Sequence, residues 1–237
     1  MKNLASEKVS KIVAGNYKTA QVFTAHGIDF CCNGGIPLEE ACESKGADIS
    51  EILKELSVIG SEAEDLKFKD MPMDELANYI VDNHHTYVRK SIPALLVYLE
   101  KIASVHGENH PELLKIARLF RQSSAGLAAH MEKEARILIH FNYELSKTGD
   151  GKVSKPHFGH IENPIALMKE EHENEGARFR EIAALSDNYT PPGDACQTYH
   201  VAYRMLNDFE SDLHKHIHLE NNILFPKAVD SYEDLVG

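Results

Sequence analysis

The sequence predicts an all-helical protein, in which a small N-terminal helical domain precedes an up-down-up-down four-helix bundle. Four long stretches of the 237-residue chain place their apolar residues at helical spacing, and each stretch ends at a cluster of Gly, Pro or Asn. Segments with the alternating pattern of strands are nearly absent. Long helices joined by short or medium loops are typical of antiparallel bundles.

The N-terminal quarter of the chain is organised differently, because its helical patterns are short. An amphipathic stretch over residues 6–25 is followed by the glycine-rich segment HGIDFCCNGG and by the patterns PLEEACESK and DISEILKELSVI. The polar, aperiodic segment after them ends at Pro72, and proline is favoured at the start of a helix. We therefore predict a small helical domain over residues 1–59, a linker over 60–72 and the bundle over 73–237.

The four long helices are predicted at residues 73–105, 111–146, 163–186 and 194–220. Pro93 lies inside the first of them, so we expect a kink there rather than an end. The periodic apolar residues that define the helices are Leu76, Ile80 and Tyr87, then Leu113, Ile116, Leu119 and Phe120, then Ile165, Met168 and Phe179, and finally Met205, Leu206, Phe209 and Leu213.

Composition and charge limit the classes of partner. The 25 Lys and Arg against 37 Asp and Glu give a formal charge of −12, which argues against a nucleic-acid surface and against anionic membranes. The N-terminus lacks a charged segment followed by an apolar run, and no stretch approaches the roughly 18 apolar residues of a membrane span. The four Cys are too few and too irregular for a disulfide framework. We expect a soluble, cytoplasmic protein with reduced thiols.

Two of the long helices contain a His four residues before a Glu. The second contains HMEKE, with His130 and Glu134, and the fourth contains HIHLE, with His216 and Glu220. At about 100° per residue, such a pair faces one direction from adjacent helical turns. Iron accepts both imidazole nitrogen and carboxylate oxygen, and a carboxylate can bridge two cations. Fourteen His in the chain is also a high count for a protein without a metal site.

Two metal ions need more ligands, and the other two long helices offer candidates. The third contains His172 in MKEEHENEG, and the first contains the adjacent His84 and His85. Adjacent helical residues point about 100° apart, so only one of this pair can share the inward stripe. The apolar residues around the pair do not settle the choice, although His85 is favoured because it is more nearly in line with Ala77, Ile92 and Leu96.

Simpler interpretations of these residues exist. A single His four residues before a Glu is usually a solvated pair with a weak contact, so the prediction depends on the pattern across four helices. His214 and His218 are also four apart and could pair with each other, but they lack a matching Glu and a counterpart helix, so we interpret them as flanking residues. No His has a Glu three residues before it, which excludes the ferritin-like ligand pattern.

The motifs resemble those of the RIC (repair of iron centres) family, hemerythrin-like di-iron proteins that repair iron–sulfur clusters. The resemblance covers nearly the whole chain and rests, in order, on FCCNGG, HHTYVRKSIPAL, HMEKEARIL, MKEEHENEG, NYTPPGDAC and HIHLENNILFP. It implies a hemerythrin-like bundle that binds two non-haem irons, oxo-bridged when oxidised, through four His and two bridging Glu. It also settles His85 over His84. The implied ligands are His85, His130, His172, His216, Glu134 and Glu220.

Two departures from related patterns matter. Oxygen-carrying hemerythrins place a further His four residues after the one on the third helix, where this chain has Gly176. We expect the missing imidazole to leave one iron with an open or water-filled position and to weaken retention of the metal.

Family members commonly follow the first His/Glu motif with ILFP, whereas this chain reads ILIHF over residues 137–141. We expect the helix to continue there without loss of the site.

Cys31 and Cys32 lie in a glycine-bounded turn of the small domain. Vicinal Cys can form only a strained, readily reduced disulfide. The resemblance implicates this domain in redox chemistry or in passing iron or nitric oxide between sites, although a free Cys is often merely a small buried hydrophobe. Cys42 and Cys196 are interpreted as structural.

The function predicted from the resemblance is donation of iron to rebuild iron–sulfur clusters damaged by nitric oxide or peroxide. Glu171, beside His172, is a candidate to guide iron out or water in. Two alternatives remain: reduction of nitric oxide at the di-iron pair, and a module that senses oxygen or nitric oxide. The absence of an attached signalling segment argues against the sensor. The expected partners are damaged iron–sulfur proteins and these small ligands, with the oligomeric state left open and a homodimer among the options.

Overall fold

The computed structural model describes residues 4–59, 64–146 and 160–236, with side chains described except at 64–66, 138–146 and 235–236. It divides the chain into two compact units, which we describe separately. Unit 1 comprises Met1–Ala77 and Lys215–Gly237, and unit 2 comprises Asn78–His214. The predicted domain boundaries at residues 59 and 73 stay a prediction.

The predicted all-helical class is confirmed. Within the described ranges no strand is formed, and β-type pairing is limited to an isolated bridge between Lys8 and Pro37. The helices of unit 1 that precede the bundle are short. Those in the segments predicted to be helical are α1 (Val9–Gly15), α2 (Ala20–Ala25), α3 (Leu38–Lys45) and α4 (Ile49–Val58), with 3-10 turns η1 (Leu4–Ser6) and η2 (Tyr17–Thr19). A further short helix, α5 (Glu64–Asp70), forms inside the segment predicted as a linker.

Local signals explain where these short helices stop and start. The amphipathic stretch over residues 6–25 breaks after α1 because Asn16 adopts an extended conformation and its side chain caps η2. Helix α3 ends at Gly46, whose φ of +64° is the left-handed conformation that glycine adopts readily. Helix α4 begins after Asp48, which accepts a hydrogen bond from the Ser50 backbone at 2.8 Å.

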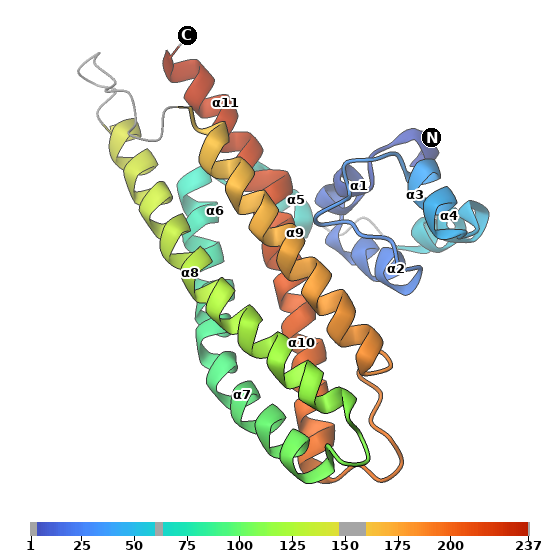
Figure 1. Cartoon of the computed structure of the whole chain (residues 1–237). Helices are drawn as coiled ribbons and strands as arrows, with labels where there is room; N and C mark the ends of the chain where they lie inside the picture. Colours follow the sequence, from blue (N-terminus) through green and yellow to red (C-terminus); the bar gives the residue numbers. More distant parts are fainter. Residues whose placement is uncertain (1–3, 60–63, 147–159, 237) are drawn as a thin grey trace. The chain divides into compact units, whose positions relative to one another are not determined.

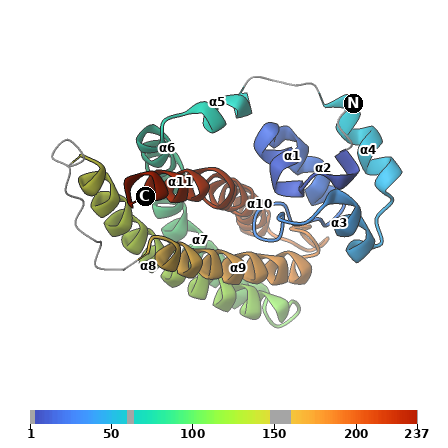
Figure 2. The ribbon, with the colours of Figure 1, turned by 90° about the horizontal axis from the view of Figure 1, so that it is seen from above.

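Unit 2 is built on four long helices that run side by side (Figures 1 and 2). These are α7 (Thr86–His106), α8 (Glu112–Ser146), α9 (Glu162–Leu185) and the part of α10 (Gln197–Leu219) that belongs to this unit. Helix α7 continues through Pro93, and α8 continues through the ILIHF segment, of which the His140 side chain lies outside the described residues. The predicted four-helix bundle is thus observed.

Aromatic packing joins three of the bundle helices. Three phenylalanines are buried with at most 1% of their surface exposed: Phe120 on α8, Phe179 on α9 and Phe209 on α10. The rings of Phe179 and Phe209 stack with centroids 5.6 Å apart, and Phe120 meets Phe209 edge to face at 5.4 Å. Each fully buried Phe contributes about 1.5–3 kcal/mol through burial alone. This cluster fixes the helix faces that also bear the candidate ligands.

The first and last predicted helices differ from expectation, since each contains a π-helical segment. The first reads α6 (Met73–Ile80), then the π segment η3 (Val81–His85), then α7. The last does not end near residue 220 but continues through the π segment η5 (Glu220–Leu224) into α11 (Phe225–Val236). Single π turns occur frequently at functional sites, because the wider turn redirects side chains. Both segments contain a predicted ligand, His85 in one and Glu220 in the other.

Candidate metal centre

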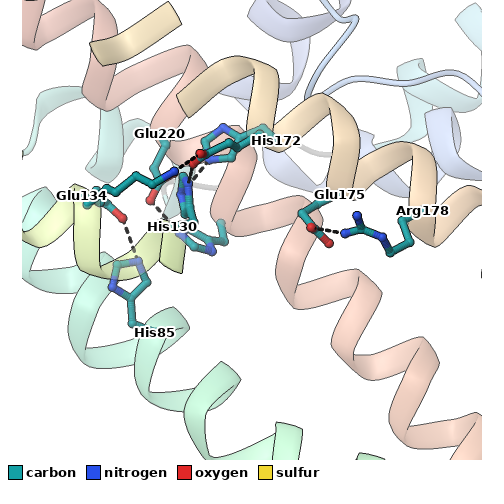
Figure 3. Close-up of polar contacts among 10 residues, drawn as sticks. His85, His130, Glu134, His172, Glu175, Arg178 and Glu220 are labelled. Carbon is teal, nitrogen blue, oxygen red and sulfur yellow. Dashed lines mark hydrogen bonds and ion pairs between the residues drawn. The ribbon is translucent and has the colours of Figure 1, made fainter. Parts of the chain in front are cut away.

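The π segment η3 directs its two adjacent His to different helices. His85 is 1% exposed, and its Nε2 lies 3.0 Å from Oε2 of Glu134 on α8 (Figure 3). His84 is 3% exposed, and its Nδ1 lies 2.8 Å from Oδ1 of Asp212 on α10. His85 therefore meets a predicted iron ligand, whereas His84 is engaged by a carboxylate outside the predicted set. This geometry supports the choice of His85.

His130 on α8 and His172 on α9 form a second pair in unit 2. Both are buried, and their Nε2 atoms lie 3.1 Å apart (Figure 3). On the other side of the His130 ring, Nδ1 lies 2.9 Å from Oε2 of Glu171. An ionised carboxylate can only accept, so Nδ1 of His130 donates and Nε2 of the neutral ring keeps its lone pair. The ring is thus oriented as metal-ligating histidines are, with the lone pair directed inward.

Glu171 is itself held by the Lys133 ammonium in addition to His130. Burial raises its pKa, but hydrogen bonds from Lys133 and His130 outweigh that effect, and the pKa of Glu171 lies below its ordinary value. Its side chain is 31% exposed and that of Lys133 is 54% exposed. Glu171 therefore connects a buried imidazole with the solvent, as a residue that guides iron or water would have to do.

Unit 1 contains the remaining two predicted ligands, on the continuation of α10 into η5. Nε2 of His216 lies 2.6 Å from Oε1 of Glu220, and the two side chains are 1% and 0% exposed. This pair shows the expected contact between residues four apart. The equivalent pair on α8 is arranged differently, because His130 faces His172 while Glu134 faces His85.

The donor set fits a metal ion such as iron. Two donors on neighbouring corners of an octahedron, each about 2.1 Å from the metal, lie about 3.0 Å apart. The contacts between His130 and His172 and between His85 and Glu134 are 3.1 and 3.0 Å. Neutral imidazole with carboxylate is also the donor mixture that iron accepts. Each of the six predicted ligands is a buried His or Glu that could offer one donor atom to a metal ion.

The two flanking His of the fourth motif have separate surroundings. In unit 2, Nε2 of His214 lies 3.9 Å from Oε1 of Glu210. In unit 1, His218 packs against Tyr17 and Phe30, and its Nδ1 contacts the Asn222 amide at 3.0 Å. Burial lowers the pKa of His218 to about 4, so the ring is neutral at physiological pH.

Sequence reasoning missed a partly buried ion pair on α9. Glu175 is 7% exposed, accepts a hydrogen bond from Ser123 Oγ at 2.6 Å and forms an ion pair with Arg178 (Figure 3). On α8, Gly126 makes room for it, since a Cβ at that position would lie 2.8 Å from Oε1 of Glu175. The sequence could have indicated Glu175 through its spacing, because Glu175 lies three residues after His172 and shares its helix face.

The four cysteines differ in exposure. Cys31 and Cys42 are buried, Cys32 is half-buried and Cys196 is exposed. The exposure of Cys196 corrects its interpretation as structural, because an exposed thiol at the start of α10 contributes little packing. Cys31 and Cys32 form a group with Asp29, a residue that sequence reasoning did not single out even though it stands two positions before Cys31.

None of the helices in the described ranges has the length and apolarity needed to cross a membrane.

Comparison with known proteins matches both parts of the chain. Residues 5–59 match the model of a domain of unknown function, DUF542, and residues 76–228 match the hemerythrin HHE cation binding domain. The iron-sulfur cluster repair protein ScdA of Staphylococcus haemolyticus is 32% identical over 92% of this chain and 96% of its own length. A probable iron-sulfur cluster repair protein of Haemophilus influenzae is 30% identical over 96% and 99%, and the iron-sulfur cluster repair protein YtfE of Musicola paradisiaca is 32% identical over 90% and 91%. The chain therefore belongs to the RIC family of hemerythrin-like iron–sulfur cluster repair proteins, as its motifs predict.

Proposed function

We propose that this protein binds two non-haem irons through His85, His130, Glu134, His172, His216 and Glu220, and that it supplies iron to rebuild damaged iron–sulfur clusters. The observation that carries the proposal is the facing pair of buried imidazoles, His130 and His172, with the outer nitrogen of His130 engaged by Glu171. Two buried nitrogens 3.1 Å apart are well placed to bind one cation.

The proposed ligand set contains two pairs of the same kind. The contact between His216 and Glu220 in unit 1 repeats the His and Glu combination of His85 with Glu134 in unit 2. The hemerythrin match over residues 76–228 includes both pairs within one family domain. Glu134 and Glu220 are the proposed bridging ligands, since a carboxylate has two oxygens and can bind two cations.

Two features favour a donor of iron over a store of oxygen. Gly176 is buried on α9, four residues after His172, and supplies no imidazole there. One iron then has fewer protein ligands and exchanges more readily. Glu171 and Lys133, both partly exposed, lie at the outer side of His130 and offer a route along which the metal could leave.

The proposed recipients are iron–sulfur proteins with damaged clusters, in agreement with the names of the relatives. Nitric oxide and oxygen are the proposed small ligands of the iron pair, and we propose a cytoplasmic location. The formal charge of −12 makes nucleic acid an unsuitable partner.

The experiment is reconstitution of a hydratase whose iron–sulfur cluster has been destroyed by nitric oxide. The iron-loaded protein is mixed with the damaged enzyme, sulfide, a thiol reductant and a chelator that captures released iron, and hydratase activity is followed. We expect recovery well above that from free iron at the same concentration. Glu134→Gln should abolish the recovery, whereas Glu132→Gln, at an exposed position on the same helix, should not.

Recovery no greater than that from free iron would overturn the donor proposal. A parallel assay with nitric oxide distinguishes iron donation from the alternative function, reduction of nitric oxide at the iron pair. Repeated turnover to nitrous oxide with an electron donor would indicate a reductase, whereas a single stoichiometric reaction would agree with a donor.

A further inference from the structure

A second group of metal-ligating side chains lies in unit 1, in the turn that follows α2. Donor atoms of Asp29, Cys31 and Cys32 all lie within 4.8 Å of one another. The Cys31 and Cys32 sulfurs are 3.7 Å apart, and the Cys31 sulfur is 3.4 Å from Oδ1 of Asp29. A disulfide would place the two sulfurs about 2.0 Å apart, so these are two separate thiols.

These separations match the edges of a tetrahedral metal site. With metal–sulfur bonds of about 2.3 Å and a metal–oxygen bond of about 2.0 Å, two sulfurs lie about 3.8 Å apart and a sulfur lies about 3.5 Å from the oxygen. The observed distances are 3.7 and 3.4 Å. A single cation could therefore bind all three donors with little movement of the chain.

The turn holds its donors in place before any ion binds. The backbone N–H groups of Cys31 and Cys32 donate to Oδ1 of Asp29 at 3.0 and 2.9 Å. The Asn221 side chain donates to the backbone oxygen of Cys31 at 3.2 Å in a buried contact. At Gly34, a Cβ would lie 2.3 Å from the Phe30 backbone oxygen, so the turn closes as tightly as it does only with glycine there.

The electrostatics of the group also favour a cation. Two thiolates and a carboxylate this close repel one another in the absence of a positive ion, and a bound metal reverses that balance and deprotonates the thiols. Cys32 and Asp29 are half-buried, which leaves one side open to an arriving ion and to a water ligand.

We propose that Asp29, Cys31 and Cys32 form a second metal site, which binds one divalent ion of iron size with a water as fourth ligand. Two metal–sulfur bonds and one metal–oxygen bond form, and the two thiol protons pass to the solvent. The charges of two thiolates, one carboxylate and one divalent ion sum to −1. This site is independent of the His and Glu centre, which contains no sulfur donor.

The test uses cobalt(II) as the probe, added to the reduced full-length chain without oxygen. Sulfur bound to cobalt gives a near-ultraviolet charge-transfer band, which His and Glu ligands cannot produce, so the band reports thiolate ligands and not the His and Glu centre. We expect the intensity of the band to correspond to one sulfur-bound cobalt per chain. It should persist in Glu134→Ala, so failure of the proposed iron centre and failure of the thiol site are distinguishable.

Matched variants identify the donors. Cys32→Ser should abolish the band, and Asp29→Asn, which keeps the shape of the turn, should weaken cobalt binding at least 10-fold. Cys42→Ser, a buried thiol in the same unit, and Cys196→Ser, an exposed thiol in unit 2, should leave the band unchanged. Circular dichroism checks that each variant is folded. The proposal is overturned if the wild type gives no band, if the band survives in Cys32→Ser, or if Asp29→Asn binds cobalt as tightly as the wild type.

Discussion

The donors of the bundle and the donors of the N-terminal turn differ in chemistry and in access to solvent. In unit 2, His85, Glu134, His130 and His172 offer only nitrogen and oxygen, and each is 3% exposed or less. In unit 1, the turn offers two sulfurs and one carboxylate, with two of its three residues half-buried. The two groups share no residue, and only the turn offers sulfur donors. The contrast predicts two metal sites that share no ligand. A substitution at one site should therefore remove its metal and leave the metal of the other site in place.

The largest expected effect is removal of a proposed bridging ligand. Glu134 is fully buried and meets His85, so Glu134→Ala should reduce the iron of the His and Glu centre from two ions per chain to fewer than about half an ion. Metal analysis of the purified variant measures this, and the cobalt band of the thiol site should be unchanged. Glu132→Ala on the exposed face of α8 is the control. Two irons retained at the centre in Glu134→Ala would mean that Glu134 is not a ligand.

A smaller loss is expected at Glu171. Glu171→Gln keeps the shape of the side chain but replaces the ionised acceptor of His130 Nδ1 with an amide. Removal of such an outer partner costs about 10-fold to 100-fold in metal affinity. Competition with a coloured chelator measures the affinity, and Glu173→Gln, at an exposed position on the same helix, is the matched control. An unchanged affinity in Glu171→Gln would show that Glu171 does not support the ligand.

The bundle should also respond to changes in packing that leave the thiol turn unaffected. Gly126→Ala places a Cβ 2.8 Å from Oε1 of Glu175, whose carboxylate is held by Ser123 and Arg178. We expect the free energy of unfolding of the metal-free protein to fall by about 1–3 kcal/mol. In a Glu175→Ala background the same substitution should stabilise by up to about 1 kcal/mol, because alanine is the better helix former.

Urea unfolding of the four proteins in this cycle gives both values. The same sign of the Gly126→Ala effect in both backgrounds would show that Glu175 is not the reason for glycine at this position. Cys32→Ser, at the half-buried thiol, should change the free energy of unfolding by less than about 0.5 kcal/mol.

Helical spacing predicted the four long helices because their apolar residues repeat over many turns, and it brought His130, Glu134, His216 and Glu220 to attention. It could not separate His84 from His85, since both are buried and the π segment η3 changes the direction of each. No pattern of apolar residues distinguishes one π turn from an α turn. The choice therefore depended on the family resemblance, and the contact of His85 with Glu134 agrees with it.

The residues that sequence reasoning missed depend on contacts between segments far apart in the chain. Glu175 is buried because Gly126, on another helix, leaves space for it. Asn221 holds the thiol turn from a position 190 residues away from Cys31. Asp29, by contrast, could have been predicted from the sequence, because its spacing from Cys31 and Cys32 already places a carboxylate beside two thiols.

The smallest effect concerns the thiols themselves and compares the two units directly. Cys196 lies at the start of α10, where hydrogen bonds from the His106 side chain and from backbone N–H groups lower its pKa to about 7. The pKa of Cys31 in unit 1 is raised. Only the thiolate reacts with iodoacetamide, so the alkylation rate of Cys196, followed by mass spectrometry, should reach half its maximum near pH 7, while Cys31 stays slow at that pH.

His106→Ala should return the pKa of Cys196 toward its ordinary value of 9.0. The rate at pH 7 should then fall roughly 5-fold to 10-fold, because the smaller thiolate fraction outweighs the greater nucleophilicity of a more basic thiolate. Cobalt(II) should protect Cys31 and Cys32 at higher pH and leave Cys196 unprotected. Equal protection of all three would mean that cobalt binds thiols indiscriminately, and the distinction between the turn of unit 1 and a single reactive thiol of unit 2 would fail.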